Sequence, residues 1–171
     1  MTITLPAEKT VPKTNIGDYP TLIYGEPGVG KTTLASKFPD AIFLATEPGQ
    51  DALSVYRIPI TNWVEFCEAC AALQKGDHEF KTVVIDTVSN LWDMCSEYIR
   101  KKHGFLHESD LGYGKGWHLV GEEFEKRLVK LSLLDLGLVM ICHSTTADIK
   151  QEGREHTKIM PDLIKTARNV I

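Results

Sequence analysis

Short, largely apolar runs separated by longer amphipathic stretches are the main pattern along this chain. Such runs are typical of strands buried on both faces of a parallel sheet. They cover residues 21–24, 41–45, 82–85 and 138–142. Helical periodicity between them predicts helices over 32–38, 62–75, 88–102 and 118–134. The alternation of strands and helices predicts an α/β fold, with a mainly parallel central sheet and helices on both faces.

Several segments interrupt this alternation. Residues 57–60 contain Pro59 and predict a short edge strand, whereas the unbroken β-branched run at 82–85 predicts a central one. Residues 104–117 are rich in glycine and are interpreted as a loop. The polar stretch 144–160 predicts a loop or small hairpin. Pro161 predicts the first turn of a last helix over 161–169.

Composition narrows the class of protein. The chain has 171 residues, of which 43% are hydrophobic and 25% charged, which fits one globular core at 19–171 preceded by an N-terminal arm at 1–18. The net charge of −4 means that any nucleic-acid contact must use a local patch. No apolar run approaches the roughly 18 residues of a membrane helix, and no signal peptide is recognisable. We therefore expect a cytoplasmic protein without a membrane partner.

The four cysteines are expected to be reduced in such a compartment. Cys67 and Cys70 form a C-x-x-C pair in the middle of the predicted helix 62–75. A zinc site needs two further ligands, and a redox pair normally opens a helix after a strand. We favour helix packing over a metal or redox role.

Residues 25–32 read Gly-Glu-Pro-Gly-Val-Gly-Lys-Thr and match the phosphate-binding P-loop pattern. A predicted strand precedes the loop and a predicted helix follows it, as the pattern requires. The glycines allow backbone N–H groups to surround a triphosphate, and the helix N-terminus adds partial positive charge. Lys31 is predicted to contact the β- and γ-phosphates of ATP, and Thr32 to bind Mg²⁺. The predicted nucleotide-binding residues are Gly25, Glu26, Pro27, Gly28, Val29, Gly30, Lys31, Thr32 and Thr33.

Three polar residues follow other predicted strands, where ligands bind in open parallel sheets. Asp86 ends an apolar run, as in a Walker B strand, and is predicted to hold Mg²⁺, with helix capping as the alternative. Glu47 is the candidate general base, or else an exposed loop residue. His143 is predicted to contact the γ-phosphate, or else to be an ordinary strand-end histidine. Together with Lys31, Glu47 and His143 form the predicted catalytic set.

These strand ends carry a family resemblance. Residues 44–53, Leu-Ala-Thr-Glu-Pro-Gly-Gln-Asp-Ala-Leu, resemble the segment that holds the catalytic glutamate of RecA recombinases. Residues 83–91 resemble the RecA Walker B strand with its helix. Residues 140–145 resemble the strand that presents the RecA allosteric glutamine, here replaced by His143. The ending at 158–163 is similar to minimal RecA-like ATP-binding proteins of phages, so that the resemblance covers roughly residues 18–171.

This resemblance implies a RecA-like P-loop NTPase fold and an ATPase stimulated by single-stranded DNA. Members of the phage group assist annealing or strand exchange in recombination, which would place the protein in the cytoplasm of a bacterial host. The implied partners are single-stranded DNA, further copies of the chain in a filament or ring, and a single-strand-binding protein. The chain departs from full recombinases in having no separate N-terminal domain and in stopping where the family sheet continues. The last strands of that sheet are expected either to lie beyond residue 171 or to be missing from an unusually short protein.

The resemblance also implies two DNA-facing loops. Basic residues suited to phosphates occur in both loops, and aromatic residues suited to unpaired bases occur in the first. They are Lys101, Lys102, Tyr113, Lys115 and Trp117 in the first loop, and Lys150, Arg154 and Lys158 in the second. Acidic residues dilute both loops, so the alternative is two solvated loops with Tyr113 and Trp117 packed on the sheet.

Two rival functions remain open at this point. A nucleotide-dependent switch, such as a helicase loader, would show slow hydrolysis that DNA does not change. A P-loop kinase for a small molecule would need an acceptor pocket and an arginine-rich lid. Arg57, Arg100, Arg127 and Arg154 are scattered along the chain and do not form a lid-like cluster.

Overall fold

The computed structural model describes residues 5–9, 11–12, 14–151, 154–169 and 171, with the backbone alone at 149–151 and 154–155. A central sheet of parallel strands has the order β1-β5-β4-β2-β3, and β6 pairs antiparallel with the outer part of β5. The strands are β1 (Thr21–Gly25), β2 (Ala41–Ala45), β3 (Tyr56–Pro59), β4 (Thr82–Asp86), β5 (Gly137–Gln151) and β6 (Arg154–Pro161). The predicted central strand β4 and edge strand β3 are confirmed.

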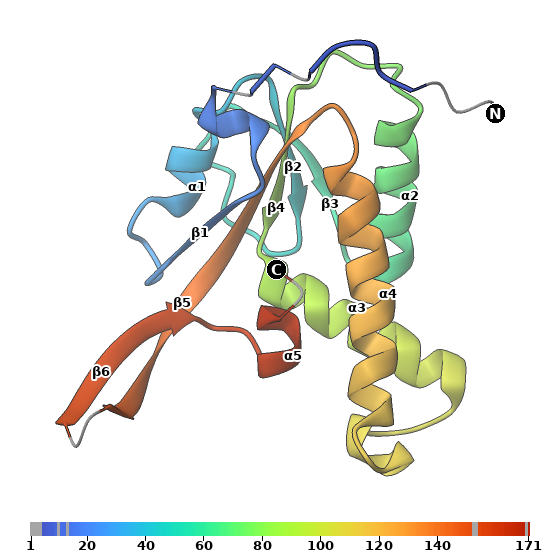
Figure 1. Cartoon of the computed structure of the whole chain (residues 1–171), viewed down its shortest axis with the longest axis vertical. Helices are drawn as coiled ribbons and strands as arrows, with labels where there is room; N and C mark the ends of the chain where they lie inside the picture. The colour runs from blue at the N-terminus through green and yellow to red at the C-terminus, as the bar shows by residue number, and fades with distance from the viewer. Residues whose placement is uncertain (1–4, 10, 13, 152–153, 170) are drawn as a thin grey trace.

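Helices cover both faces of the sheet unequally (Figure 1). They are α1 (Lys31–Ala35), α2 (Trp63–Gln74), α3 (Val88–His103), α4 (Lys115–Ser132) and α5 (Lys165–Arg168), with 3₁₀ turns η1 (Ile16–Asp18) and η2 (Glu108–Leu111). Side chains of β4 alternate, so that Val83 and Ile85 join the core under α2, α3 and α4, while Val84 joins the smaller core under α1. The predicted α/β fold with a mainly parallel sheet is therefore confirmed.

Aromatic side chains connect the helices that cover the larger core. Trp63 of α2 stacks on Phe124 of α4 with ring centroids 5.7 Å apart, and Trp92 of α3 meets Phe124 edge-on at 5.0 Å. The indole N–H of Trp63 donates to Glu123 at 3.3 Å, so its one polar group is satisfied. Burial of each such side chain contributes about 1.5–3 kcal/mol, which holds α2, α3 and α4 together on this face of the sheet.

Three predicted segments differ from the structure. The P-loop helix ends at Ala35, and α4 begins at Lys115, where Gly114 with φ of 74° starts the helix. The polar stretch 144–160, predicted as a loop or small hairpin, is a hairpin formed by the outer half of β5 and β6. Pro161 is the last residue of β6, paired with Ser144, so the predicted helix start there is wrong and α5 begins four residues later. The main-chain pairing of two polar strands left no hydrophobic pattern to detect.

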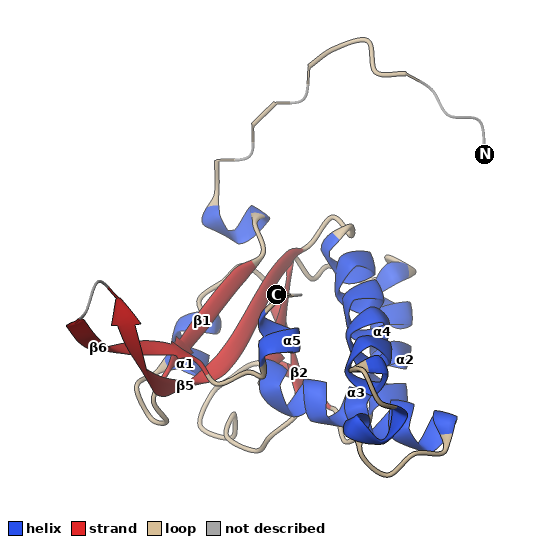
Figure 2. Ribbon diagram, turned by 60° about the horizontal axis from the view of Figure 1, so that its bottom comes forward, coloured by secondary structure: helices blue, strands red, loops and turns tan. Residues whose placement is uncertain are grey.

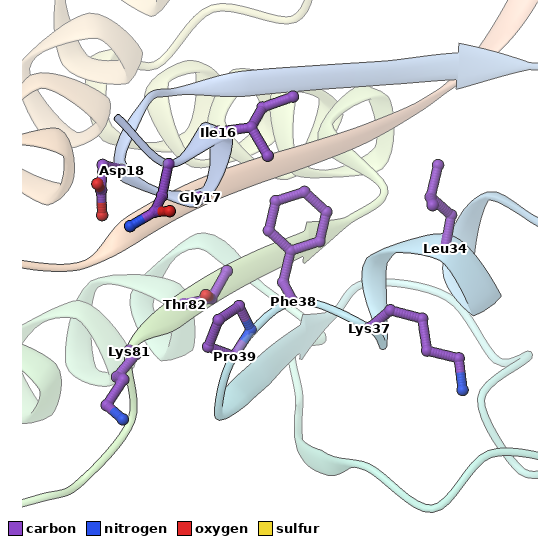
Figure 3. A pocket seen from close by; sticks show the side chains of 10 residues that line it. Ile16, Gly17, Asp18, Leu34, Lys37, Phe38, Pro39, Lys81 and Thr82 are labelled. Atoms are coloured by element: carbon purple, nitrogen blue, oxygen red, sulfur yellow. The ribbon is translucent and has the colours of Figure 1, made fainter. Parts of the chain in front are cut away.

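The described residues before Asn15 form no helix or strand and are exposed (Figure 2). The division into an arm and a core stays a prediction. Beside η1 lies a hollow of about 350 Å³, where side chains of Ile16, Leu34 and Phe38 lie around the start of β4 at Thr82 (Figure 3). None of the predicted nucleotide-binding residues lines this hollow. Across the described residues, every helix is too short or too polar to cross a membrane.

Candidate nucleotide-binding site

The P-loop connects the end of β1 to α1 at the carboxyl edge of the sheet. Gly28 and Gly30 have φ values of 79° and 94°, in the left-handed region that other residues rarely adopt. A Cβ atom at either glycine would meet no heavy atom within 4 Å, so the backbone conformation explains the need for glycine here. The loop therefore has the sharp turns that direct N–H groups toward a phosphate.

Lys31 is buried at the first position of α1. Its ammonium donates hydrogen bonds of 2.9 Å to the carbonyl oxygens of Gly25 and Glu26. Both acceptors are uncharged, so the positive charge of Lys31 is left to balance an anion such as a phosphate.

Asp86 lies at the end of β4 and is 2% exposed. Its Oδ2 accepts a hydrogen bond of 2.9 Å from the Thr32 hydroxyl and another of 2.9 Å from the Gln50 amide. A hydroxyl and a carboxylate in contact are the oxygen ligands that Mg²⁺ takes beside nucleotide phosphates. The Oε1 atom of Gln50 is buried without a hydrogen-bond partner among the described residues, which marks this corner as polar and incompletely satisfied. The donor set fits a magnesium ion.

Glu47 follows β2 by two residues and is held from two sides. Its Oε2 accepts a hydrogen bond of 3.3 Å from the Asn90 amide, and its Oε1 lies 3.6 Å from Nε2 of His143. Gly25 and His143 pair across β1 and β5, so His143 lies level with the start of the P-loop. The structure thus brings the candidate base and the candidate sensor into contact.

A cleft of about 350 Å³ joins these groups. The predicted residues that line it come from all four predicted strand ends. They are Pro27, Gly28, Gly30, Lys31, Thr32, Thr33, Glu47, Asp86 and His143. The predicted residues Gly25, Glu26 and Val29 belong to the loop but are not among the lining residues. The predicted roles of all these residues stay predictions, whereas their proximity is established.

Gln50 and Asn90 were not among the residues predicted from the sequence. Each lies within four residues of a predicted carboxylate, Gln50 after Glu47 and Asn90 after Asp86. That spacing is the only signal that was available in the sequence. It does not reveal that each amide bonds the carboxylate of the other segment.

The first predicted DNA-facing region covers the end of α3, which contains Lys101 and Lys102, the α3–α4 connection and the start of α4. Lys101 pairs with Glu97 at 2.6 Å, and the Lys102 ammonium lies 5.6 Å from the centre of the Tyr98 ring. Tyr113 has φ of 47° and is fully exposed. Its ring is therefore available to a base, and the alternative of Tyr113 packing on the sheet is wrong.

Lys115 and Trp117 lie in α4 rather than in a loop. The Trp117 ring is half-buried and packs edge-on against His107, with centroids 6.0 Å apart. Its packing inside the connection, rather than on the sheet, makes Trp117 a weaker candidate for base stacking than Tyr113.

A buried carboxylate organises this connection. Glu108 in η2 is 5% exposed and accepts a hydrogen bond from the Ser96 hydroxyl, while Arg100 lies 3.7 Å away. Burial alone raises the pKa of Glu108, but the Ser96 hydrogen bond and the Arg100 charge outweigh it and lower the pKa below its usual value. Gly116 packs against the Glu108 backbone with no room for a Cβ atom. The connection predicted as a loop is therefore held to α3 by Glu108 and to α4 by Gly116.

The second predicted DNA-facing region is the β5–β6 hairpin. Lys158 is exposed on β6, and the Thr157 hydroxyl donates to Asp148 across the strands at 2.8 Å. The side chains of Lys150 and Arg154 lie outside the described part of the chain. In Figures 1 and 2 the hairpin and the α3–α4 connection project from opposite sides of the molecule. The described parts of the two regions therefore lie apart on the molecule.

The cysteines take no part in this site. Cys67 and Cys70 lie in α2, half-buried against the larger core, and both are free thiols. Burial raises the pKa of the Cys70 thiol to about 12, so it remains protonated near neutral pH. Among the described residues, no three His, Cys, Asp or Glu side chains are placed to hold a metal ion. The predicted packing role of the C-x-x-C pair agrees with this placement.

Comparison with known families agrees with the geometry of the cleft. Residues 18–171 match the family described as AAA domain, and the chain belongs to this family. Membership indicates a P-loop domain with ATP binding and nucleotide-dependent ATPase activity. The curated proteins include none that matches the chain.

Proposed function

We propose that this domain is a RecA-like ATPase that binds single-stranded DNA and promotes annealing or strand exchange in phage-type recombination. The observation that carries the proposal is the placement of His143. It contacts Glu47 in the nucleotide cleft and lies on the strand that continues directly into the exposed β5–β6 hairpin. One β-strand, β5, therefore connects the nucleotide cleft to the β5–β6 hairpin, a candidate DNA-binding element.

The nucleotide side of the proposal assigns a task to each group in the cleft. Lys31 balances phosphate charge, and Thr32 with Asp86 would hold Mg²⁺. When bound, this ion neutralises charge on the phosphate oxygens. Glu47 orients and deprotonates the attacking water, since its carboxylate faces the same cleft. Most of the catalysis would come from positioning and electrostatics.

The proposed coupling between the nucleotide cleft and the hairpin depends on the continuity of β5. Ser144, the residue after His143, begins the pairing with β6. A shift of the His143 backbone therefore changes the start of the hairpin ladder. Nucleotide state would be transmitted through this ladder to Lys158 and its neighbours.

The DNA side rests on exposed chemistry. Tyr113 offers a free ring for stacking, and Lys101, Lys102 and Lys158 offer exposed ammonium groups for phosphates. No base-reading motif is visible, so weak sequence preference is expected. The RecA resemblance supports assembly of the chain on DNA as a filament or ring, and cooperation with a single-strand-binding protein.

One observation favours a second candidate, a nucleotide-dependent switch of the helicase-loader type. Glu47 is engaged by both Asn90 and His143, and in this candidate the two contacts hold the carboxylate away from water, so hydrolysis is slow. The kinase alternative receives no comparable support. No arginine lines the cleft in the described chain, and Arg57, Arg100 and Arg127 are engaged by Asp51, Glu108 and Glu123.

DNA binding in defined nucleotide states tests the proposal. The measurement is fluorescence anisotropy of a labelled mixed-sequence single strand with a slowly hydrolysed ATP analogue, with ADP, and without nucleotide, each in the presence of Mg²⁺. The recombinase proposal predicts tight binding with the analogue only, and its loss in Lys31→Ala. Absence of binding in every state would reject it and favour the switch.

A further inference from the structure

The segments that carry the two carboxylates of the cleft are braced to each other. The Thr46 hydroxyl accepts a hydrogen bond of 2.7 Å from the Thr87 N–H and donates one of 2.9 Å to the Thr87 carbonyl. The Thr46 N–H also donates to the Asp86 carbonyl at 2.8 Å. These three hydrogen bonds therefore hold the ends of β2 and β4 together without the side chains of Glu47 and Asp86.

Two carboxamides extend this brace in a reciprocal manner. Gln50, from the segment of Glu47, donates to Asp86, whereas Asn90, from the segment of Asp86, donates to Glu47. Each acid is thus held by an amide from the segment of the other. An amide adds a hydrogen-bond donor without a charge that would compete with Mg²⁺ or neutralise the base.

Asn90 is well suited to orient Glu47. It lies in the first turn of α3, where the backbone is already fixed by the hydrogen bond from the Leu91 N–H to the Thr87 carbonyl at 3.2 Å. Its amide occupies Oε2 of Glu47 and leaves Oε1 on the side of His143. A glutamate without such a partner has several rotatable bonds and samples many orientations.

We propose that Asn90 is a positioning residue for Glu47: its amide holds one carboxylate oxygen so that the other faces the attacking water. This inference rests on the proposed ATPase function, in which Glu47 is the base. Asn90 itself contacts neither phosphate nor metal in this account. Its loss should therefore slow the chemical step without weakening nucleotide binding.

The test compares Asn90→Ala, Asn90→Asp and the control Asn62→Ala in steady-state hydrolysis. Asn62 caps α2, where its side chain accepts a hydrogen bond of 3.0 Å from the Glu65 N–H. Its replacement therefore removes an asparagine side chain away from the cleft. We expect kcat to fall about tenfold in Asn90→Ala, with KM for ATP and the Kd for ADP unchanged within twofold. Asn90→Asp keeps the shape but replaces the donor by a like charge, so kcat should fall at least as far. The control should keep the wild-type kcat.

Three results would overturn the inference while leaving the ATPase intact. They are an unchanged kcat in both Asn90 variants, a milder loss in Asn90→Asp than in Asn90→Ala, and a rise in kcat. The second would indicate packing alone, and the third would mean that Asn90 holds Glu47 away from water. A wild-type protein that binds ATP without hydrolysing it would instead reject the proposed function, and this inference with it. Thermal denaturation of each variant identifies any loss of kcat that comes from unfolding.

Discussion

The β5–β6 hairpin and the α3–α4 connection are both proposed to face DNA, but they are attached to the molecule in different ways. The hairpin is a two-stranded extension whose strands pair with each other beyond the sheet. The α3–α4 connection is closed by a 3₁₀ turn and anchored by the buried Glu108. The hairpin is held mainly by the hydrogen bonds between its own two strands. The α3–α4 connection is held by a small buried polar cluster.

This difference separates two tasks. The hairpin begins one residue after His143, so it is placed to respond to the nucleotide. The anchor of the α3–α4 connection lies near the far end of α3, 22 residues along the chain from Asp86. We therefore expect the hairpin to change with nucleotide state, and the α3–α4 connection to act as a fixed platform for bases.

The largest effect is expected at the link between cleft and hairpin. In His143→Ala the side chain that touches Glu47 is lost, so DNA-stimulated kcat should fall about a hundredfold, as for removal of a group that stabilises the transition state. The measurement is ATP hydrolysis at saturating single-stranded DNA. His118→Ala removes an exposed histidine on α4 and is the matched control. Full stimulation in His143→Ala would show that the hairpin is driven from elsewhere.

The next effect concerns Glu108, which anchors the α3–α4 connection. Glu108→Gln leaves Ser96 and Arg100 without their carboxylate, and should lower the free energy of unfolding by about 2 kcal/mol at neutral pH. Because the folded-state pKa of Glu108 is lowered, its contribution is full above the unfolded value of about 4.3 and is lost as the pH falls further.

Denaturant unfolding of both proteins from pH 7 to pH 3 measures this contribution. The two stability curves should converge toward the acidic end. Curves that stay parallel over this range would contradict the assignment of Glu108 as the charged anchor.

A smaller effect is expected at Tyr113, on the same connection, where DNA binding should change without a change in stability. Tyr113→Ala removes a fully exposed ring and should weaken binding of single-stranded DNA about tenfold, which is typical of one stacked base, with no change in stability. Anisotropy titration and thermal denaturation measure the two quantities. Tyr56→Ala removes an exposed tyrosine on β3 whose ring packs edge-on against Phe80, and it is the control for affinity. Equal affinities in the two variants would exclude stacking on Tyr113.

The smallest effect is expected for a single charge on the hairpin. Lys158→Ala should reduce the slope of log affinity against log salt concentration by about 0.7, the value for one phosphate contact on a single strand. Lys75→Ala, after the end of α2, provides a matched loss of charge. A slope that is the same in both variants would remove Lys158 from the interface.

The sequence predicted the nucleotide cleft well because parallel topology brings the carboxyl ends of strands together. Asp86, Glu47 and His143 each follow an apolar run, so their proximity followed from the fold class. The braces by Gln50 and Asn90 could not be predicted in this way. An amide bonds whichever acceptor lies within reach, and only the packing of two distant segments decides which one that is.

The two DNA-facing elements were harder to predict for different reasons. The glycines at 104–117 indicated a loop, yet Gly116 lies in α4 and packs closely against Glu108. The hairpin has polar residues on both faces, so the period of two that identifies a half-buried strand was absent. Burial of a charged residue and pairing of polar strands both depend on tertiary contacts rather than on local pattern.

Coupling of the nucleotide cleft to DNA is tested by steady-state ATP hydrolysis with a mixed-sequence single strand, with the corresponding duplex, and without DNA. Lys31→Ala provides the control for hydrolysis at this P-loop. If the cleft is coupled to the hairpin, single-stranded DNA stimulates turnover and duplex DNA has little effect. Hydrolysis that is indifferent to DNA, in a protein that still binds ATP, would contradict the coupling of the cleft to the hairpin.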